Sequence, residues 1–394
     1  MKRINKTMIC FVLAVCLTVG APFAAFSVNA ESITEEETLA PAGFEILAKS
    51  AVLMDVSTGT VLFAQNEKEA LPPASVTKVM TLLLIAEAIE LGRITMEEQV
   101  TVSEHASSMG GSQVFLEAGE SMSVEDLFKS VVMASANDAA CALAEHICGS
   151  EEAFVAKMNE RAIELGMLNT HFENTNGLDD TTVNHVTSAM DIGIMSCQLL
   201  RHEFVMNYTT LWMDSIRNGE FTLTNTNRLV RFYPGCTGLK TGSTEKAKFC
   251  ISASAKRDGM HLVAVIMGAE SRDVRNEEAK KLLDYGFSNY AEYCDKGIEI
   301  PPIPVKGGTL AECPVAYQPL SAVLDKSSAK GVKISYETVE EIIAPVKKND
   351  VVGKVTYSVN SEIICERDIV ASSDVTKISL WEVLARLASV MLGG

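Results

Sequence analysis

Residues 238–270 read GLKTGSTEKAKFCISASAKRDGMHLVAVIMGAE, and this stretch decides the fold class of the chain. Residues 249–255 and 261–267 are apolar runs that flank an Arg-Asp-Gly turn at 257–259, which is typical of a β-hairpin. Residues 238–243 precede the hairpin and are predicted to form a further strand of the same sheet. The stretch therefore predicts an antiparallel sheet.

The rest of the first three-quarters of the chain adds a second hairpin and several helices. Apolar runs at residues 51–55 and 60–65 flank a Ser-Thr-Gly turn, which predicts the second hairpin. Strands at both ends of this region with helices between them predict an α+β domain, in which a helical cluster packs on an antiparallel sheet. Apolar spacing and helix-ending residues predict helices at 74–91, 124–133, 138–147, 151–165, 186–200 and 277–289.

The composition changes near residue 297. Pro-Pro-Ile-Pro at 301–304 is typical of a linker. Three short β-type runs between residues 333 and 370 predict a small β-rich domain, which has no cluster of catalytic residue types. We therefore expect a main domain at residues 31–295 and a β-rich domain at residues 296–373.

The N-terminus has the three parts of a secretory signal. Lys2, Arg3 and Lys6 form a basic start, residues 8–19 are apolar, and Val-Asn-Ala at 28–30 is a small-residue cleavage site. We expect residues 1–30 to be removed on export, so that the mature protein works outside the cytoplasm.

Residues 374–394 are predicted to form an amphipathic helix. Glu382, Arg386 and Ser389 share its polar side, which argues against a helix that spans a membrane. We expect the helix to lie on a membrane surface, and packing against its own domain is the alternative. The apolar residues at helical spacing are Leu380, Leu384, Leu387 and Met391, with Trp381 at the edge.

Charge and residue patterns exclude several functions. The formal net charge is −17 and becomes −20 once the three basic residues of the signal are removed, so nucleic acid is not an expected partner. The ten cysteines include no Cys-x-x-Cys pair, and the six histidines include no His-x-x-x-His or His-Glu-x-x-His pattern. We therefore expect no metal and no cofactor, while disulfide pairing and the oligomeric state stay open.

Ser75-Val76-Thr77-Lys78 opens the long helix predicted at 74–91. The three-residue spacing places Ser75 and Lys78 on one helical face. A serine hydroxyl is a poor nucleophile until a base takes its proton. Lys78 can be that base if burial and a nearby cation lower its pKa from about 10.4 toward neutrality.

A second motif, Ser135-Ala136-Asn137, lies in a polar break between two predicted helices. The hydroxyl of Ser135 can relay a proton. The amide of Asn137 can bind a substrate carbonyl or orient Lys78.

A third motif, Lys240-Thr241-Gly242, lies on the strand predicted at 238–243. The ammonium and hydroxyl groups of Lys240 and Thr241 can bind a carboxylate. Gly242 has no side chain, so a substrate backbone can lie close to the strand edge.

The order and spacing of the three motifs carry more information than each motif alone. Ser135 follows Ser75 by 60 residues, and Lys240 follows Ser135 by 105 residues. This trio is typical of β-lactamases and penicillin-binding proteins. The stretches PPASVTKVMT and MASANDAA, and the one that starts GLKTGSTEK, resemble the low-molecular-mass penicillin-binding proteins, the D-alanyl-D-alanine carboxypeptidases. The resemblance covers residues 40–290.

The resemblance implies a β-lactamase/transpeptidase-like fold and an enzyme at the outer face of the bacterial cytoplasmic membrane, or secreted. Such an enzyme removes the terminal D-alanine from peptidoglycan stem peptides through an acyl-enzyme. β-Lactams are expected to inhibit it by acylating the same serine.

The resemblance also implies a role for each matching residue. Ser75 would attack the substrate carbonyl, Lys78 would accept its proton, and Ser135 would pass a proton to the departing amine. The backbone N–H groups of Ser75 and Ser243 would form the oxyanion hole, and Ser243 stands where some relatives carry histidine. The substrate-binding residues would be Asn137, Lys240, Thr241, Gly242, Ser243 and Arg275.

Three alternatives stay open. A class A β-lactamase needs a glutamate in a Glu-x-x-Leu-Asn loop, but Leu165 stands at that position ahead of Leu168 and Asn169, while Glu164 and Glu173 are out of register. A wall endopeptidase or transpeptidase would use the same chemistry. A non-catalytic penicillin-binding wall sensor would be expected to carry a damaged motif, and all three motifs are intact.

Overall fold

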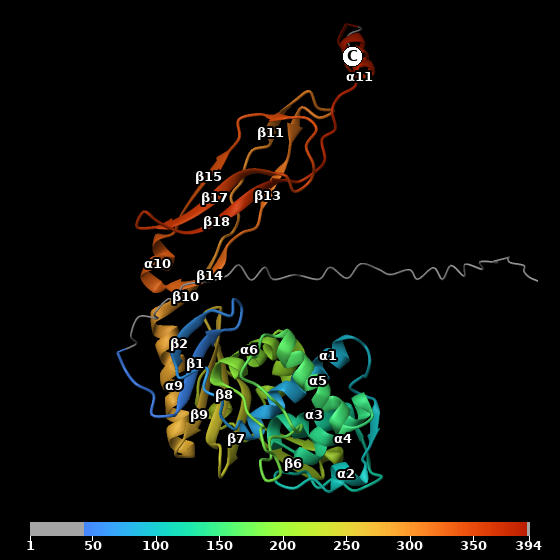
Figure 1. Cartoon of the computed structure of the whole chain (residues 1–394), viewed down its shortest axis with the longest axis vertical. Helices are drawn as coiled ribbons and strands as arrows, with labels where there is room; N and C mark the ends of the chain where they lie inside the picture. The colour runs from blue at the N-terminus through green and yellow to red at the C-terminus, as the bar shows by residue number, and fades with distance from the viewer. Residues whose placement is uncertain (1–42, 392–394) are drawn as a thin grey trace, which may run out of the picture. The chain divides into compact units, whose positions relative to one another are not determined.

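The central element of the protein is a five-stranded antiparallel sheet, seen in the computed structural model that describes residues 43–391 (Figure 1). The signal expected at residues 1–30 lies outside the described residues. The strand order is β2-β1-β9-β8-β7, so both predicted hairpins lie in one sheet that joins the start and the end of the domain. The strands are β1 (Ser50–Asp55), β2 (Val61–Gln65), β7 (Cys236–Thr244), β8 (Lys248–Arg257) and β9 (Met260–Ala269).

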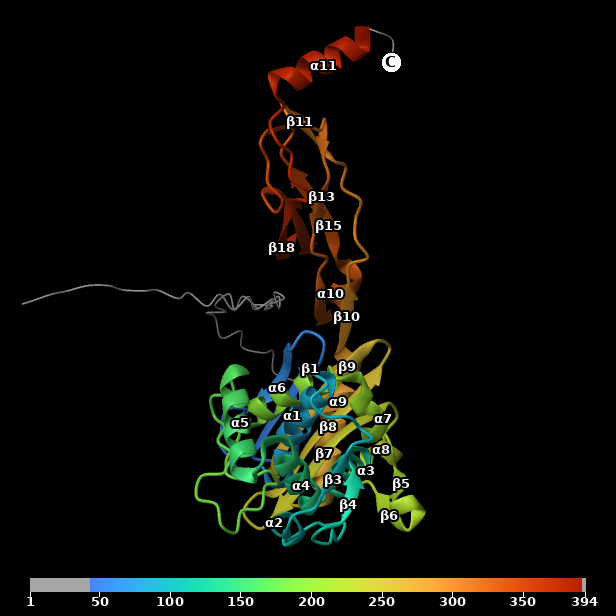
Figure 2. The same ribbon diagram turned by 90° about the vertical axis from the view of Figure 1, so that its right-hand side faces the viewer.

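Alternate residues of the central strands face two separate hydrophobic cores. In β9, Val263 and Val265 belong to the core shared with the helical cluster, whereas Leu262 and Ala264 belong to the core shared with α9 (Arg272–Asn289). Figure 1 shows α9 on one side of the sheet and the helical cluster on the other, and Figure 2 shows the same arrangement from the side of the cluster. A strand covered on both faces favours apolar residues on both of its sides, which explains the apolar run at residues 262–267 of β9.

The helical cluster differs from the prediction mainly where helices begin and end. The helix expected at 74–91 begins as a 3-10 turn, η1 (Ala74–Thr77), and the helix expected at 124–133 ends in a π-helical turn, η2 (Ser130–Ala134). The first of these turns contains Ser75, and the second ends directly before Ser135. The main helices are α1 (Lys78–Glu90), α3 (Val124–Lys129), α4 (Asn137–Cys148), α5 (Glu151–Glu164) and α6 (Ala189–Leu200). The smaller elements are β3 (Gln99–Thr101), α2 (Glu104–Ser107), β4 (Ser121–Ser123), η3 (Glu203–Val205), α7 (Met206–Thr209), β5 (Met213–Ile216), η4 (Arg217–Gly219), β6 (Phe221–Thr224) and α8 (Leu229–Phe232).

The C-terminal part of the chain is β-rich, with its own core around Val355, Tyr357 and Ile369. It contains a three-stranded sheet, β12-β11-β16, and a four-stranded sheet, β13-β18-β17-β15. A separate ladder pairs β10 with β14 across the boundary expected after residue 295, so that boundary stays a prediction. The elements are β10 (Tyr290–Cys294), β11 (Ile303–Lys306), β12 (Glu312–Cys313), β13 (Val315–Tyr317), β14 (Ser321–Asp325), α10 (Lys326–Gly331), β15 (Lys333–Thr338), β16 (Ile342–Ile343), β17 (Val351–Val359) and β18 (Glu362–Ala371).

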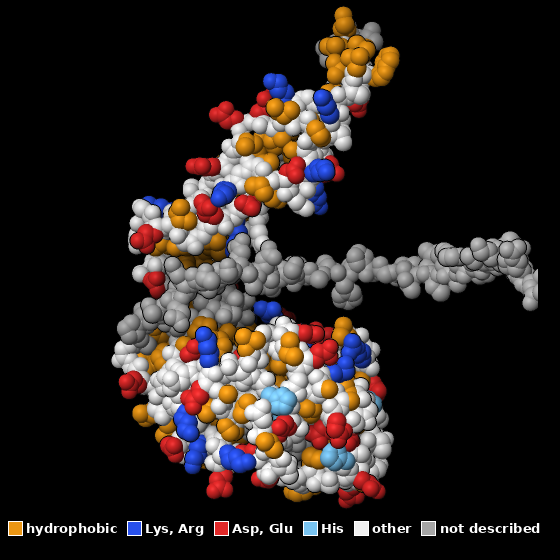
Figure 3. Space-filling model, in the orientation of Figure 1, with side chains coloured by type: hydrophobic (Ala, Val, Ile, Leu, Met, Phe, Trp, Pro, Cys, Tyr) orange, Lys and Arg blue, Asp and Glu red, His pale blue; other side chains and the backbone are white. Residues whose placement is uncertain are grey.

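The last helix, α11 (Leu380–Met391), exposes the side chains of Leu380, Trp381, Leu384, Leu387 and Met391. The exposed fractions of Leu380, Trp381 and Met391 are 72%, 80% and 86%. Apolar side chains gather on this helix in Figure 3. Within residues 43–391, no helix combines the length and the apolar character needed to cross a membrane.

Candidate active site

Ser75 lies in η1 at the mouth of a cavity. The residue before it, Ala74, has a φ of 49°, in the left-handed region that residues with a Cβ rarely adopt. This turn leaves Ser75 half-buried, with its Oγ 3.0 Å from Nζ of Lys78. The three-residue spacing of the motif therefore brings the hydroxyl and the amine into contact.

Lys78 is fully buried, and its amine is held by two further groups. Its Nζ lies 2.6 Å from Oδ1 of Asn137 and 2.8 Å from the carbonyl oxygen of Asn176. Burial, and then the charge of Lys240, lower the pKa of Lys78 well below its usual value. A neutral amine has two N–H groups and one lone pair. Because the two oxygens only accept, they take both N–H groups and leave the lone pair for the Ser75 hydroxyl.

Asn137 is itself fixed by the segment that precedes β4. Its Nδ2 donates to the carbonyl oxygen of Gly110 and its backbone N–H to that of Ser112, both at 2.7 Å. Because the carbonyl of Gly110 can only accept, it determines which end of the Asn137 amide faces Lys78. Asn137 thus presents an acceptor to the amine.

Ser135 and Lys240 form a second contact beside the first. Ser135 follows the π-helical turn η2 with a φ of 62°, again in the left-handed region. The buried Nζ of Lys240 donates to Oγ of Ser135 and to the carbonyl of Thr241, both at 2.8 Å. Burial, and then the charge of Arg275, lower the pKa of Lys240 to about 7. The Ser135 hydroxyl is therefore held next to a group that can exchange a proton near neutral pH.

Gly242 allows β7 to lie directly against η1. A Cβ at this position would lie 2.8 Å from the backbone nitrogen of Ser75 and 2.9 Å from the carbonyl oxygen of Pro73. Such distances require the backbone to shift, so the third motif and the first can meet only through a glycine. On either side, Thr241 is buried and Ser243 is exposed.

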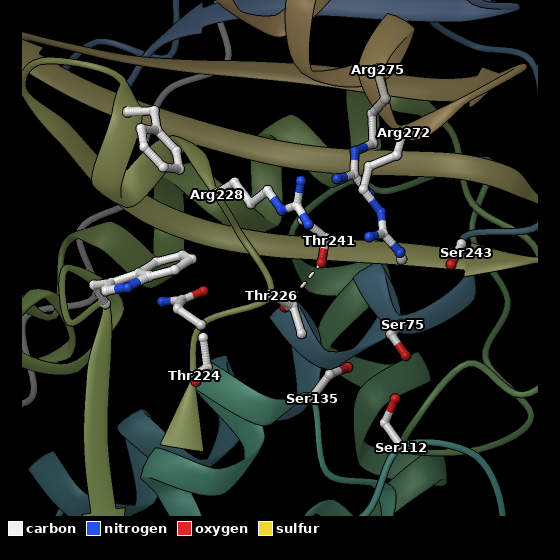
Figure 4. A pocket seen from close by; sticks show the side chains of 14 residues that line it. Ser75, Ser112, Ser135, Thr224, Thr226, Arg228, Thr241, Ser243, Arg272 and Arg275 are labelled. Atoms are coloured by element: carbon white, nitrogen blue, oxygen red, sulfur yellow. Dashed lines mark hydrogen bonds between the residues drawn. The ribbon is translucent and has the colours of Figure 1, made fainter. Parts of the chain in front are cut away.

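These groups surround one cavity of about 660 Å³, within the range of roughly 300–1,000 Å³ typical of ligand pockets. Figure 4 shows hydroxyl groups gathered at one end of it and guanidinium groups converging near Thr241 at the other. The hydroxyl groups belong to Ser75, Ser112 and Ser135, and the guanidinium groups to Arg228, Arg272 and Arg275.

The three arginines make one end of the cavity strongly cationic. Arg275 is only 3% exposed, and its Nε and Nη2 donate to Oδ1 of Asn276 at 3.1 and 2.9 Å. Burial, together with the charges of Arg272 and Arg228, lowers the pKa of Arg275 to about 10. An anionic group bound here would relieve the mutual repulsion of these cations.

The structure brings the residues of all three motifs to this cavity or directly behind its wall. Lys78, Asn137 and Lys240 lie behind the wall and reach the cavity through hydrogen bonds. The predicted residues that line the cavity are Ser75, Ser135, Thr241, Gly242, Ser243 and Arg275.

Sequence reasoning missed several residues of the site, and three of them are instructive. Arg272 lies three residues before Arg275 on α9, and this helical spacing could have revealed it. Arg228 lies in an irregular segment before α8 and belongs to no motif. Asn176 contributes its backbone carbonyl. Every residue type has such a carbonyl, so the sequence gives no sign of this role.

The two glutamates considered as the extra glutamate of a β-lactamase make their polar contacts outside the cavity. Glu164 forms an ion pair with Arg161 at 2.7 Å. The carboxylate of Glu173 accepts hydrogen bonds from the backbone N–H groups of Val183 and Asn184. Neither residue lines the cavity.

The eight cysteines of the described residues are all free thiols. Cys236 and Cys250 flank the third motif, but they lie near opposite ends of the β7–β8 ladder. Cys236 is paired with Ala255, and Cys250 with Gly242.

Comparison with known proteins identifies the family. The family Peptidase_S11, D-alanyl-D-alanine carboxypeptidase, matches residues 34–271. The chain belongs to this family. The C-terminal domain of penicillin-binding protein 5 matches residues 294–377 of this S11 carboxypeptidase.

Known proteins are similar to this S11 carboxypeptidase in sequence or structure over most of its length. D-alanyl-D-alanine carboxypeptidase DacF of Bacillus subtilis (strain 168) is 42% identical over 86% of this chain and 88% of its own. DacC of Escherichia coli (strain K12) is 32% identical over 83% of this chain and 84% of its own. The crystal structure of penicillin binding protein 5 from Haemophilus influenzae has a TM-score of 0.75 and 32% identity, covering 85% of this chain and 99% of its own.

These similarities confirm three of the predictions. The fold is an α+β transpeptidase-like domain followed by a β-rich domain. The protein is a serine-type D-Ala-D-Ala carboxypeptidase of the penicillin-binding family. The resemblance to low-molecular-mass penicillin-binding proteins was therefore correct.

Proposed function

We propose that Ser75 and Lys78 carry out the acylation step of this carboxypeptidase. Oγ of Ser75 attacks the carbonyl of the penultimate D-alanine while Lys78 takes the hydroxyl proton. The observation that carries this proposal is the buried amine 3.0 Å from Ser75 Oγ, whose other two contacts are acceptors. The backbone N–H groups of Ser75 and Ser243 stabilise the oxyanion, a contribution typically worth about 100- to 1,000-fold in rate.

The departing D-alanine leaves from the Ser135 side of the cavity. When the C–N bond breaks, the hydroxyl of Ser135 relays to the amine the proton that Lys78 accepted, so the acylation step has no net proton change. Lys240 orients the Ser135 hydroxyl at 2.8 Å, and Asn137 orients Lys78 at 2.6 Å. Water then hydrolyses the ester and releases the shortened stem peptide.

The terminal carboxylate of the substrate binds at the cationic end of the cavity. Thr241 and Arg275 line this end of the cavity and would bind the carboxylate, and Lys240 would add its charge from behind Thr241, whose carbonyl its Nζ contacts. Arg228 and Arg272 line the same end and add to the attraction for a free carboxylate. A β-lactam carries a carboxylate next to its reactive amide, so it would occupy the same place and acylate Ser75.

Labelling with a fluorescent penicillin tests the nucleophile. We expect a single adduct on Ser75 by mass spectrometry, no adduct in Ser75→Ala, and free D-alanine released from a D-Ala-D-Ala peptide by the unchanged protein. Ser112→Ala is the matched control, because Ser112 lines the same cavity and should leave labelling intact. An adduct on another residue, or labelling of Ser75→Ala, would overturn the assignment.

We also propose that residues 1–30 direct export of the enzyme and are then removed. Residues 374–394, which follow the domains at 31–295 and 296–373, hold the exported enzyme at the outer face of the membrane. The exposed apolar side chains of α11 support this. The test is sedimentation with anionic lipid vesicles of the double variant Leu384→Asp, Leu387→Asp. It should lose binding while D-alanine release from a soluble peptide is unchanged, and the control Leu310→Asp changes an exposed leucine of the β-rich domain. Equal sedimentation of the double variant and the control contradicts the proposal.

A further inference from the structure

His105, Cys141 and Glu145 form a cluster of metal-ligating side chains that does not line the cavity. One ligand atom from each lies within 4.8 Å of the other two. Cys141 and Glu145 are four residues apart on α4, so they share one helical face, and His105 comes from α2. Glu151, at the start of α5, completes the group, with its Oε2 3.0 Å from Nε2 of His105 and 3.8 Å from Sγ of Cys141.

We propose that these four side chains bind a single divalent cation of the zinc type. Thiolate, imidazole and carboxylate are the ligands that zinc takes in proteins. A tetrahedral ion with bonds of about 2.0–2.3 Å holds its ligand atoms roughly 3.3–3.8 Å apart, so small rotations of these side chains suffice. The site joins three helices, which is why no short spacing pattern in the sequence revealed it.

The arrangement of the cluster favours a cation. The carboxylate of Glu151 contacts both the imidazole of His105 and the thiol of Cys141, and Glu145 adds a second carboxylate within the same 4.8 Å group. A divalent ion would bind the thiolate of Cys141 and the neutral imidazole of His105, and the thiol proton would pass to solvent. The side chain of His105 is 51% exposed and provides an entry path.

The cluster is connected to the segments that hold the active site. Asn137 begins α4, one helical turn before Cys141. Glu151 Oε1 accepts hydrogen bonds from the backbone N–H and the hydroxyl of Thr175, at 3.0 and 2.7 Å. The next residue, Asn176, contributes the carbonyl that holds Lys78. A bound cation would therefore brace α2, α4 and the 174–176 segment together, and its first effect should be on stability.

Metal titration of the purified, reduced protein tests this proposal. We expect one equivalent of Zn²⁺ to bind and to raise the melting temperature, with no competition from Mg²⁺, which prefers oxygen ligands. Co²⁺ in place of Zn²⁺ should show a sulfur-to-cobalt charge-transfer band. That band reports ligation by a thiolate directly and does not depend on enzymatic activity.

Two variants and one control locate the ion. Cys141→Ser should abolish the charge-transfer band, and His105→Ala should weaken Zn²⁺ binding by at least about 100-fold, the upper end of the loss seen for second-shell partners. His105 is exposed, so its replacement does not endanger folding. Cys148→Ser changes a half-buried cysteine on the same helix and should bind like the unchanged protein. Absence of Zn²⁺ binding in the unchanged protein, an unchanged Zn²⁺ affinity in His105→Ala, or a charge-transfer band that persists in Cys141→Ser overturns the proposal.

Discussion

Two buried polar networks of the protein have opposite effects on the charged forms of the groups that they contain. In the catalytic domain, Lys78 and Lys240 are fully buried, and their amines contact hydroxyl, amide and carbonyl oxygens. At the start of the β-rich domain, the carboxylate of Asp295, the last residue of the expected main domain, accepts hydrogen bonds from the hydroxyls of Tyr317 and Tyr357 at 2.8 and 2.6 Å. In the first network the hydrogen-bond partners of the two amines are neutral oxygens, and the charge of the nearby Asp138 offsets only part of the pKa lowering of Lys78. In the second network the anion accepts hydrogen bonds from hydroxyl donors.

The pKa values show what this difference means. Burial lowers the pKa of both lysines, which is unfavourable for a charged group but useful for a base. Burial alone would raise the pKa of Asp295, yet the hydrogen bonds from Tyr357, Gly297 and Tyr317 lower it overall. A buried ionisable group whose charged form is destabilised by its surroundings points to a catalytic role. A buried group whose charged form is stabilised by hydrogen bonds points to a structural role.

The largest effect should come from removing the base. Lys78→Met keeps a long side chain but has no lone pair to accept the Ser75 proton. The rate of Ser75 acylation by penicillin should fall by about 10²- to 10⁴-fold, the usual contribution of a general base. Stopped-flow labelling measures this rate, and circular dichroism checks that the variant is folded. A rate within a few-fold of the unchanged protein would show that Lys78 is not the base.

Gly242→Ala should have the next largest effect, because it changes the distance between the third motif and the nucleophile. The added Cβ would lie 2.8 Å from the backbone nitrogen of Ser75, so β7 must move away from η1. A displacement of about 1 Å can cost roughly 100-fold in rate. Gly331→Ala is the control in the β-rich domain, where the nearest atom would be 3.9 Å away. Equal acylation rates for the two variants would contradict a close contact at Gly242.

Much of the fold could be predicted from the sequence because its signals are local. The apolar runs of β8 and β9 and their turn fix a hairpin wherever they lie in the chain. The predicted ends of helices were wrong where tertiary contacts determine where a helix begins. The helix expected from residue 186 begins at Ala189, because Val186 and Thr187 form bridges with His171 and Leu71.

The side chains proposed as catalytic could be named from the sequence for the same reason, and the groups that support them could not. Ser75, Lys78 and Lys240 belong to short motifs whose residue types are informative. Asn176 acts through a backbone carbonyl and Arg228 through its position in an irregular segment, so neither leaves a pattern.

Tyr357→Phe tests the network around Asp295 and should lower the free energy of unfolding without changing the acylation rate. The change removes one of the donors to Asp295 and leaves the buried N–H of Leu320 without its hydroxyl partner. An unsatisfied buried group of this kind costs about 1–3 kcal/mol. Urea unfolding should show that loss, with an unchanged acylation rate at Ser75. A slower acylation rate in the folded variant would mean that the two networks are coupled.

The smallest effect concerns the pH at which the base becomes active. Lys78 must be neutral to accept a proton, so the acylation rate should rise with pH as Lys78 deprotonates and fall as pH drops through its pKa. Below about pH 7 Lys240 carries its own proton and opposes charging of Lys78. Lys240→Gln removes that cation, so the midpoint of the pH profile should move to higher pH whatever happens to the maximal rate.

The shift should be limited, because burial is the larger cause of the lowered pKa of Lys78 and it remains in the variant. Arg272→Gln is the control, since Arg272 is exposed in the cavity and acts on Arg275 rather than on Lys78. A midpoint that stays in place in Lys240→Gln would mean that burial alone tunes the base. The second lysine would then serve only to orient Ser135 and to bind the carboxylate.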